Sequence, residues 1–386
     1  MADSRPPNVD RSLGASTPLV PPLFQSSVYT LPDLDALDRI MNAEEKGFIY
    51  ARDGHPNAKW LGEELAAAEG AAWGIVCGSG MAAVTAGLLS LVQQGDRIVA
   101  SNRLYGRTTQ LLTQELTRYG IQTEFVDSAN ESEVRAALEK PARVLFVETM
   151  SNPLLRLVDI EGLASLAEEG GAGLIVDNTF ATPALVKPLE LGADFVVESL
   201  TKMIGGHSDV TLGLLAGTDS DLVPQISQLI SIWGLASNPF DCWLATRGLT
   251  TLAVRMQVAS ANASALADWL EDQSGVKRVI YPGRPDHPDH ELARRLLHDG
   301  FGNMLCFELA DGREGVNRFL RKAKGIPFSP SLGNVTTTCS HPSTTSHRYV
   351  SVAEKRRQGI GDGLIRLSVG VEELKQLQKE IAQGLR

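Results

Sequence analysis

The sequence has few cysteines, no long apolar run and no cluster of basic residues. Its 386 residues include only four cysteines, which are far apart and form no Cys-x-x-Cys pair. A disulfide framework is therefore not expected. We expect the protein to work in a reducing compartment such as the cytosol. No stretch approaches the roughly 20 consecutive apolar residues of a membrane-spanning helix. Residues 1–10 are polar and lack the apolar segment of a secretory signal.

The charge balance also limits the possible partners. The chain has 46 acidic and 36 basic residues, a formal net charge of −10, and no long basic run. Nucleic acid and anionic membranes are therefore not expected as partners. Four of the five histidines within residues 286–347 lack the compact spacing of metal ligands, so no metal site is predicted. They are His287, His290, His298 and His341.

The central feature of the sequence is a lysine that follows an apolar run. Residues 195–197 indicate a buried strand, and Lys202 comes shortly after it, between Ser199-Leu200-Thr201 and Gly205-Gly206. A lysine kept neutral by burial attacks carbonyl groups and forms Schiff bases. Neighbouring hydroxyls and glycine backbone could hold a phosphate. On its own, the pattern also fits a solvated surface lysine.

A carboxylate ends the preceding apolar strand. Leu174-Ile175-Val176 leads directly to Asp177. An aspartate there can pair with the protonated ring nitrogen of pyridoxal phosphate, or it can simply cap a helix. Asp177 and Lys202 would meet at the carboxyl edge of an open α/β sheet, where such sheets bind ligands.

These motifs together resemble a known family. Asp177-Asn178-Thr179, Ser199-Leu200-Thr201-Lys202 and Gly206-His207-Ser208-Asp209 closely resemble the Cys/Met-metabolism pyridoxal-phosphate enzymes. That family comprises cystathionine γ-synthases, β- and γ-lyases, methionine γ-lyases and O-acylhomoserine sulfhydrylases, and the resemblance covers nearly the whole chain.

The resemblance implies an architecture. The fold would be α/β, that of the fold-type I pyridoxal-phosphate transferases related to aspartate aminotransferase. Such a fold has a large, mixed but mostly parallel sheet domain and a smaller C-terminal α/β domain. We expect an arm over residues 1–60 that contacts a neighbouring subunit, a large cofactor-binding domain over 61–245, and a linking helix with the C-terminal domain over 246–386. The resemblance also implies a homotetramer, a dimer of dimers with shared active sites.

Two further segments suit a cofactor phosphate. Residues 74–83 indicate a strand, a tight turn and a helix, and a helix that begins with glycine presents backbone N–H groups to an anion. The glycine spacing does not match a dinucleotide fingerprint. The resemblance implies that Gly80 and Met81 hold the phosphate by their amides. It also implies that Tyr50-Ala51-Arg52 matches a Tyr-x-Arg motif that reaches the phosphate of the neighbouring active site.

The resemblance assigns the other cofactor contacts as well. Lys202 would carry the cofactor, and Asp177 would bind its ring nitrogen. Tyr105 would stack on the ring and exchange a proton with the leaving group, although a tyrosine at a strand end is often only a packing residue. The contacts would be completed by Thr179, Ser199, Thr201 and Asn152.

Substrate contacts are expected from two regions of the chain. Arg366 lies in the apolar strand 364–368, where an unpaired guanidinium is costly, so it needs an anionic partner. The resemblance implies that this partner is the α-carboxylate of an amino acid, also contacted by Asn152 and Ser331. Asn152 precedes Pro153, so its local sequence is equally typical of a plain turn.

Some positions depart from the family pattern. Pro330 stands where many γ-synthases and cystathionine γ-lyases carry a glutamate for the distal amino group of cystathionine. Arg107 replaces a common glycine and adds charge near the substrate. His55-Pro56-Asn57-Ala58 replaces Asn-Pro-Thr-Arg, and Thr336-Thr337-Thr338 replaces Glu-Ser-Leu. From Pro330 we predict a carbon–sulfur lyase that performs β- or γ-elimination on cystathionine-like substrates. The alternative is γ-replacement by a cystathionine γ-synthase or O-acylhomoserine sulfhydrylase.

Other classes of protein fit the sequence less well. A Schiff-base aldolase would not need Asp177 or two phosphate-holding segments, and a nicotinamide dehydrogenase would need the missing fingerprint. A non-catalytic scaffold would not need Lys202, Asp177, Arg52 and Arg366 together.

The remaining patterns predict the course of the chain. We expect helices over residues 61–69 and 108–119, a long and mostly helical segment over 240–270 with a bend at Gly248, and strands over 144–147, 304–309 and 364–368.

Overall fold

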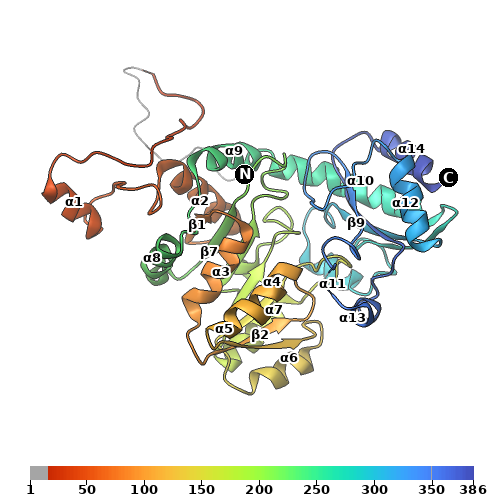
Figure 1. Cartoon of the computed structure of the whole chain (residues 1–386), viewed down its shortest axis with the longest axis horizontal. Helices are drawn as coiled ribbons and strands as arrows, with labels where there is room; N and C mark the ends of the chain where they lie inside the picture. Colours follow the sequence, from red (N-terminus) through yellow and green to blue (C-terminus); the bar gives the residue numbers. More distant parts are fainter. Residues whose placement is uncertain (1–15, 349) are drawn as a thin grey trace.

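A large sheet is the centre of the fold in the computed structural model, which describes residues 16–348 and 350–386. Within these residues the sheet has seven strands in the order β1-β7-β6-β5-β4-β2-β3 (Figure 1). Strand β7 runs antiparallel to its neighbours β1 and β6, and the remaining pairs are parallel. The strands are β1 (Trp73–Cys77), β2 (Arg97–Ser101), β3 (Gln122–Val126), β4 (Val144–Glu148), β5 (Gly173–Asp177), β6 (Phe195–Ser199) and β7 (Gly213–Gly217).

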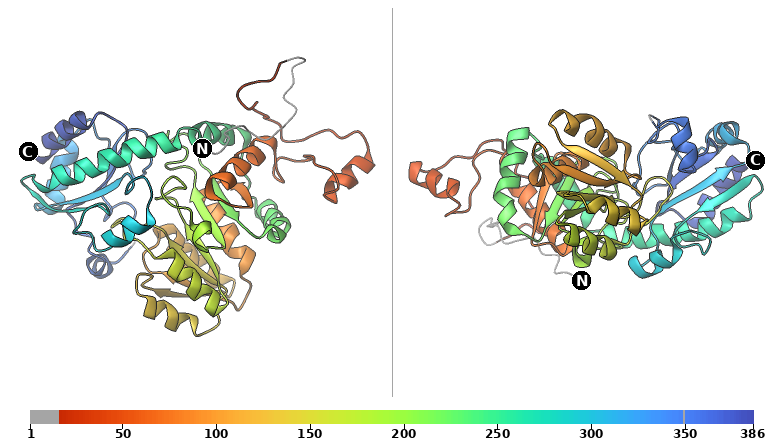
Figure 2. Two further views of the ribbon diagram at one scale, coloured as in Figure 1. Left: turned by 180° about the vertical axis from the view of Figure 1, so that it is seen from behind. Right: turned by 90° about the horizontal axis from the view of Figure 1, so that it is seen from below.

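The segment before the large sheet extends away from it. Helix α1 (Leu34–Met41) stands apart from the rest of the chain in both views of Figure 2. The segment exposes apolar side chains, with Leu19 at 96% and Leu34 at 77% exposure. It is attached where the Trp243 indole N–H donates to the Pro21 carbonyl across 2.9 Å. Such exposed apolar surface is typical of a segment that meets another protein surface. Residues 1–15 of the predicted arm lie outside the described part of the chain.

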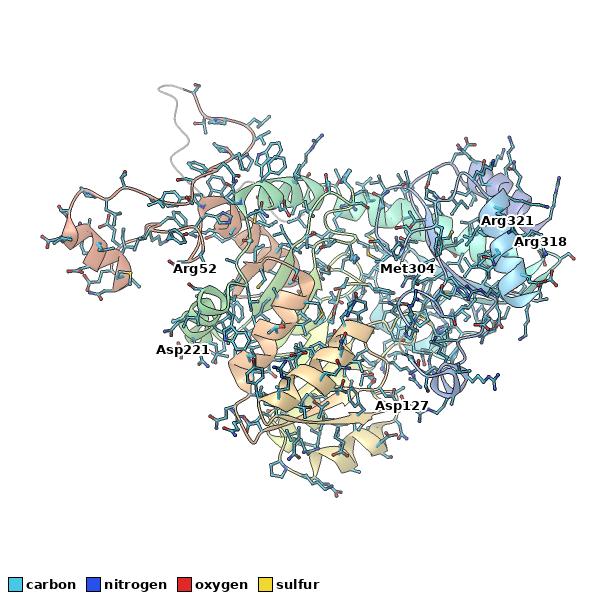
Figure 3. All side chains as sticks on the ribbon, in the orientation of Figure 1. Arg52, Asp127, Asp221, Met304, Arg318 and Arg321 are labelled. Atoms are coloured by element: carbon cyan, nitrogen blue, oxygen red, sulfur yellow. The ribbon has the colours of Figure 1, made fainter. Side chains whose placement is uncertain are left out.

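A smaller domain follows helix α10 (Leu252–Glu271), which leads from α9 (Pro239–Leu249) into it (Figure 1). Its four-stranded sheet has the order β10-β11-β9-β8, and all of its strand pairs are antiparallel. Figure 3 shows the labelled Arg318 and Arg321 of helix α12 on the outer side of this domain. Its elements are β8 (Val276–Ile280), α11 (His290–Leu296), β9 (Met304–Leu309), α12 (Gly312–Lys322), β10 (Thr338–Ser340), α13 (Val352–Arg357), β11 (Leu364–Ser368) and α14 (Leu374–Leu385).

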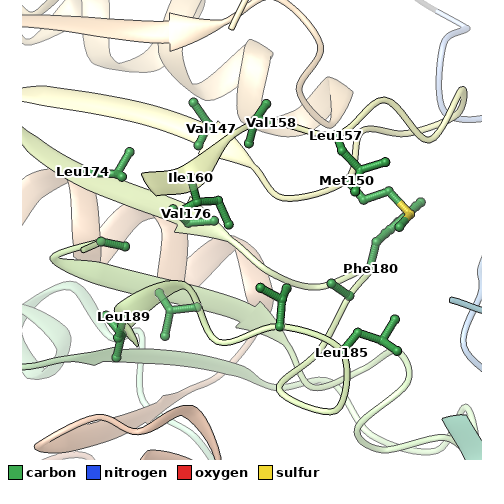
Figure 4. Close-up of a cluster of buried hydrophobic side chains, with 14 of the residues drawn as sticks. Val147, Met150, Leu157, Val158, Ile160, Leu174, Val176, Phe180, Leu185 and Leu189 are labelled. Carbon is green, nitrogen blue, oxygen red and sulfur yellow. The ribbon is translucent and has the colours of Figure 1, made fainter. Parts of the chain in front are cut away.

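Helices cover both faces of the large sheet, which explains its continuous apolar strands. Successive residues of a strand point to opposite faces. Val147 and Val176 therefore belong to one hydrophobic cluster, shown in Figure 4, while Phe146 and Ile175 belong to another. The two-domain architecture predicted from the sequence, a large mixed sheet and a smaller α/β domain, is confirmed. The flanking helices include α2 (Pro56–Glu69), α3 (Gly80–Leu91), α6 (Glu131–Leu138), α7 (Ile160–Gly170) and α8 (Val223–Trp233).

Two predicted helices differ in detail. The segment 240–270 is divided into α9 and α10 at Thr250–Thr251. A Cβ on Gly248 would lie 2.4 Å from the Gly205 carbonyl oxygen, so this glycine allows α9 to pack against the lysine loop. The predicted helix 108–119 begins at Gly106 and contains a π-helical turn over Leu111–Glu115. The domain boundary at residue 245 falls inside α9, and the predicted boundaries stay predictions.

Candidate active site

A cavity of about 1390 Å³ opens at the carboxyl edge of the large sheet, facing the C-terminal domain. The segments that follow β1, β2, β4, β5 and β6 line one side of it, because the carboxyl ends of parallel strands share one edge. The lining includes most of the residues singled out from the sequence: Gly80, Met81, Tyr105, Asn152, Asp177, Thr179, Ser199, Thr201, Lys202 and Arg366.

Lys202 lies between the two domains. Its Nζ donates a hydrogen bond to Ser331 Oγ across 3.1 Å, so the predicted substrate residue Ser331 touches the predicted catalytic amine. Burial, and then the positive charge of Arg366, lower the pKa of Lys202 below its usual value. Gly333 packs against the same segment, because a Cβ there would lie 2.5 Å from the backbone nitrogen of Met203. The site therefore favours a neutral amine, which is the nucleophilic and basic form.

Asp177 is held at the end of β5. Its Oδ1 accepts a hydrogen bond from the Thr179 backbone N–H across 3.0 Å. The Thr179 hydroxyl accepts from the Ser199 N–H across 2.9 Å, which ties the end of β5 to that of β6. Burial raises the pKa of the Asp177 carboxyl, and the hydrogen bonds from Thr179 oppose that rise. A positively charged ring nitrogen would compensate the buried charge.

Helix α3 begins beside these two strand ends. Its N-cap Ser79 accepts from the Ala82 N–H across 3.0 Å, and the first N–H groups of a helix have no intrahelical partner. A Cβ on Gly80 would lie 2.8 Å from the Ser199 Cβ, so only glycine allows this approach. The arrangement suits a phosphate.

Thr201 is already bonded within the chain. Its hydroxyl donates to the Leu212 carbonyl across 3.3 Å and accepts from the Leu212 N–H across 3.2 Å. It lines the cavity, and its predicted contact with the cofactor stays a prediction.

Arg366 joins the C-terminal domain to the loop after β4. Its Nη1 donates to Asn152 Oδ1 across 2.7 Å and its Nη2 to the Ser331 carbonyl across 3.4 Å. Its Nε is buried and has no partner among the described residues. Burial lowers the pKa of Arg366 to about 10. A buried guanidinium with an unsatisfied donor is a strong candidate to bind a carboxylate.

Tyr105 and Glu148 adjoin this region. The Tyr105 side chain lines the cavity and is 41% exposed, and its backbone N–H donates to Glu148 Oε1. Burial, and then the negative charge of Asp177, raise the pKa of Glu148 well above its usual value. Glu148 was not singled out from the sequence. It ends β4 in register with Asp177 at the end of β5, so the same strand-end signal could have identified it.

His347 and Arg107 also line the cavity, His347 in the C-terminal domain and Arg107 in α4 (Gly106–Gln110). His347 is buried, and burial followed by the charge of Arg366 lowers its pKa to about 4, so it is neutral at pH 7. Arg107 is exposed at the cavity and donates to Gln110 Oε1 across 2.8 Å. Among the described residues, no group of His, Cys, Asp or Glu could hold a metal ion.

Tyr50 and Arg52 lie elsewhere. The Arg52 guanidinium lies 5.1 Å from the centre of the Tyr50 ring, and its Nε donates to Ser231 Oγ of α8 across 3.4 Å. Figure 3 shows Arg52 well apart from Asp127, a residue of the cavity wall. Neither Tyr50 nor Arg52 lines the cavity of its own chain. Their contact with a neighbouring active site stays a prediction.

Two of the departures from the family pattern have structural roles away from the cavity. His55 caps α2 by accepting from the Ala58 N–H across 3.1 Å, and Asn57 binds the arm through the Phe24 N–H and the Pro22 carbonyl. Thr337 donates its hydroxyl to Glu372 across 2.9 Å.

The profile of the Cys/Met-metabolism PLP-dependent enzymes matches residues 8–386. The chain belongs to this family. Curated members at a similar level of identity have different activities, as the following three show. The O-succinylhomoserine sulfhydrylase of Pseudomonas aeruginosa is 41% identical over 94% of this chain and 90% of its own. An L-methionine gamma-lyase of Fusobacterium nucleatum is 39% identical over 95% of this chain and 93% of its own. The cystathionine beta-lyase MetC of Bacillus subtilis is 41% identical over 89% of this chain and 87% of its own.

Solved structures agree with this assignment. Cystathionine gamma synthase from Xanthomonas oryzae, in complex with cystathionine, is 35% identical with a TM-score of 0.91, covering 97% of this chain and 95% of that one. An O-acetylhomoserine (thiol)-lyase from Campylobacter jejuni, which carries a pyridoxyl-lysine phosphate, is 30% identical with a TM-score of 0.90, covering 95% of each chain. The fold-type I architecture and the family predicted from the sequence are confirmed.

Pyridoxal phosphate is the cofactor of this Cys/Met-metabolism enzyme, and the residues present fit it. The start of α3 offers N–H groups where Gly80 keeps the backbone open, and Asp177 is a partly buried carboxylate that has no ion-pair partner among the described residues. Lys202 supplies a neutral amine in the same cavity.

Proposed function

We propose that this enzyme cleaves the carbon–sulfur bond of cystathionine-like amino acids by β- or γ-elimination. The observation that carries the proposal is the position of Ser331, whose hydroxyl accepts from Lys202 Nζ and whose carbonyl accepts from Arg366 Nη2. An amino acid with its carboxylate on Arg366 therefore has its α-carbon beside Lys202. That geometry suits removal of the α-proton by a positioned base.

The chain's own residues divide the work. Arg366, Asn152 and Ser331 orient the amino acid, and Lys202 Nζ accepts the α-proton, which its lowered pKa favours. Bound pyridoxal phosphate supplies an electron sink for the α-carbon. Asp177 keeps the proton on the ring nitrogen, and the Tyr105 hydroxyl exchanges a proton with the leaving group. The phosphate is held by Gly80, Met81, Ser199 and Thr201, with Thr179 bracing Asp177 against Ser199.

Pro330 favours elimination over γ-replacement, because the carboxylate that is typical of the synthases at this position is missing. It lines the cavity one residue before Ser331 and offers no carboxylate to an ammonium. Product analysis with L-cystathionine tests the proposal. Cysteine with 2-oxobutanoate identifies γ-elimination, and homocysteine with pyruvate identifies β-elimination. Absence of a 2-oxoacid from both cystathionine and methionine would overturn the lyase assignment.

Arg107 favours a second candidate, γ-replacement on an O-acylhomoserine. Its guanidinium is exposed at the cavity, and the partner shown for it is the neutral amide of Gln110. A cation there suits an acyl chain that ends in a carboxylate, as in the substrate named for the Pseudomonas relative. Homocysteine formed from O-succinylhomoserine and sulfide would support this reaction. A rise in KM in Arg107→Gln for the succinyl ester, but not for the acetyl ester, would assign the acyl contact.

The proposal extends to assembly and location. We infer a cytoplasmic homotetramer, a dimer of dimers in which Tyr50 and Arg52 complete the phosphate site of a neighbour. The exposed apolar side chains of the arm support a subunit contact. No described helix has the length and apolar character needed to cross a membrane. Light scattering on the purified holoenzyme tests the tetramer, and a monomer at micromolar concentration would contradict it.

A further inference from the structure

A second polar cluster lies behind the end of β5, and Glu198 is the member of it that also borders the cavity. It contains Glu69 at the end of α2, Asn178 after β5 and Glu198 in β6, with exposures of 0%, 0% and 1%. Asp177 and Thr179 line the cavity and Asn178 does not, as expected when successive side chains point to opposite sides. The cluster therefore adjoins the predicted cofactor-binding carboxylate through the backbone.

Asn178 is the centre of this cluster. Its Nδ2 donates to three acceptors, which are the Val186 carbonyl across 3.0 Å, Glu198 Oε1 across 3.2 Å and Glu69 Oε1 across 3.4 Å. Its Oδ1 accepts from the hydroxyl of Thr149, the residue after β4, across 2.8 Å. These bonds join the ends of β4 and β5 to β6 and α2. The position of Asn178 thus fixes the backbone that carries Asp177.

The two glutamates lack a donor for their remaining oxygens. Glu69 Oε1 and Glu198 Oε1 lie 3.4 Å and 3.2 Å from the same Asn178 Nδ2, so the two buried carboxyl groups are neighbours. The Oε2 atoms of both are buried, and no described donor reaches either of them. Ionised carboxylates only accept hydrogen bonds, so a bond between two carboxyl groups requires a proton on one of them. We propose that Glu69 and Glu198 share one proton and that this acid–carboxylate pair positions Asn178 and, through it, Asp177.

The surrounding charges agree with a shared proton. Burial raises the pKa of both glutamates, and the negative charge of Asp177 raises that of Glu198 further. The positive charge of Lys187 lowers the pKa of Glu69, and the negative charge of Glu190 raises it. Lys187 is itself paired with Glu190 across 3.1 Å. Like charges held this close do not both ionise at neutral pH.

Infrared spectroscopy of the full-length holoenzyme and apoenzyme at neutral pH tests the proton directly. Wild type is expected to show a protonated-carboxyl C=O band, shifted in D2O, that disappears in Glu69→Gln and in Glu198→Gln, because the new amide N–H replaces the shared proton. Glu308→Gln is the matched control, since Glu308 is a buried carboxylate neutralised by Arg278 across 2.6 Å and should leave the band unchanged. A difference spectrum without this band, or a band lost in only one of the two variants, would overturn the sharing.

Stability provides an independent readout of the same proton. A raised pKa in the folded state stabilises the fold below the unfolded pKa and loses that contribution as pH rises through the folded value. The apoenzyme midpoint temperature should therefore fall as the pH rises above the unfolded glutamate pKa of about 4.3, because the folded state keeps one extra bound proton, and it should fall less in Glu198→Gln. An equal fall in both proteins would contradict the proposal.

The inference that the glutamate pair positions Asp177 rests on the proposed function, because it assumes that Asp177 binds the ring nitrogen of the cofactor. Glu198→Ala should release pyridoxal phosphate at least several-fold faster and shift its absorbance band, whereas Glu198→Gln should stay near wild type. Equal release from wild type and Glu198→Ala would overturn positioning even if the infrared band is present. Failure of the lyase assay would leave the infrared result unaffected, so the two proposals can fail separately.

Discussion

Arg366 Nη1 donates a hydrogen bond to Asn152 Oδ1 across 2.7 Å, although the two residues belong to different domains and are 214 positions apart. Arg366 lies on β11 of the small sheet, and Asn152 follows β4 of the large one. The contact holds the two walls of the cavity together. The buried Arg366 Nε has no partner in the part of the chain that the structure describes, so a substrate carboxylate can bind there.

Arg366→Lys should therefore impair substrate binding while the protein still folds. Lysine keeps the charge but loses the planar fork that binds a carboxylate with two parallel bonds. A charge-assisted hydrogen bond contributes about 1.5–3 kcal/mol, so kcat/KM should fall by ~10- to 100-fold per lost bond. Steady-state kinetics with L-cystathionine measure this effect. Arg356→Lys on the exposed surface of α13 is the control, and an unchanged KM in Arg366→Lys would contradict the assignment.

Lys202→Ala should abolish both the absorbance of the lysine-bound cofactor and nearly all turnover. The Lys202 amine has a pKa lowered by burial and by Arg366, which makes it the reactive amine of the cavity. The ultraviolet–visible spectrum and product formation are measured on the same preparation. Lys187→Ala, which removes a surface lysine paired with Glu190, should keep both properties. Full activity in Lys202→Ala would refute the mechanism.

The sequence predicted the residues that end strands better than the contacts between domains. Asp177 and Lys202 follow apolar runs, and the sheet edge brings such positions together without further information. Glu148 ends β4 in the same register as Asp177, so its omission was an error of interpretation and not a lack of signal.

Other features depend on packing that no local pattern shows. The break between α9 and α10 falls at Thr250–Thr251, after Gly248 has packed against the Gly205 carbonyl. The bonding of Thr201 to the Leu212 backbone links residues on either side of the lysine loop. The cluster of Glu69, Asn178 and Glu198 joins segments more than 100 residues apart, as the 109-residue separation of Asn178 and Glu69 shows.

The charge of Arg366 should shift the pH dependence of cofactor capture. A lowered lysine pKa makes the neutral amine available at lower pH, so the rate at which the apoenzyme rebinds pyridoxal phosphate should rise with pH through that pKa. Arg366→Gln removes a nearby positive charge, and its midpoint should therefore move to higher pH. Stopped-flow absorbance across a pH series measures the midpoint. Arg356→Gln serves as the control, and coincident profiles for wild type and Arg366→Gln would contradict the coupling.

Two inactive variants should restore activity to each other if the arm completes a neighbouring site. Arg52 contacts Ser231 and Tyr50 in its own chain and does not line its own cavity. In a mixed dimer of Lys202→Ala and Arg52→Ala, one site lacks both residues and the other has both. Random pairing of equal amounts should then recover about a quarter of wild-type sites, as expected for a two-fold symmetric dimer with shared sites.

Co-refolding or co-expression followed by an assay of 2-oxoacid or homocysteine formation measures the recovery. Differently tagged Lys202→Ala and Arg52→Ala chains that are recovered together through one tag show that subunits have exchanged. If subunits exchange and activity does not return, Arg52 acts within its own chain and the shared-site proposal fails.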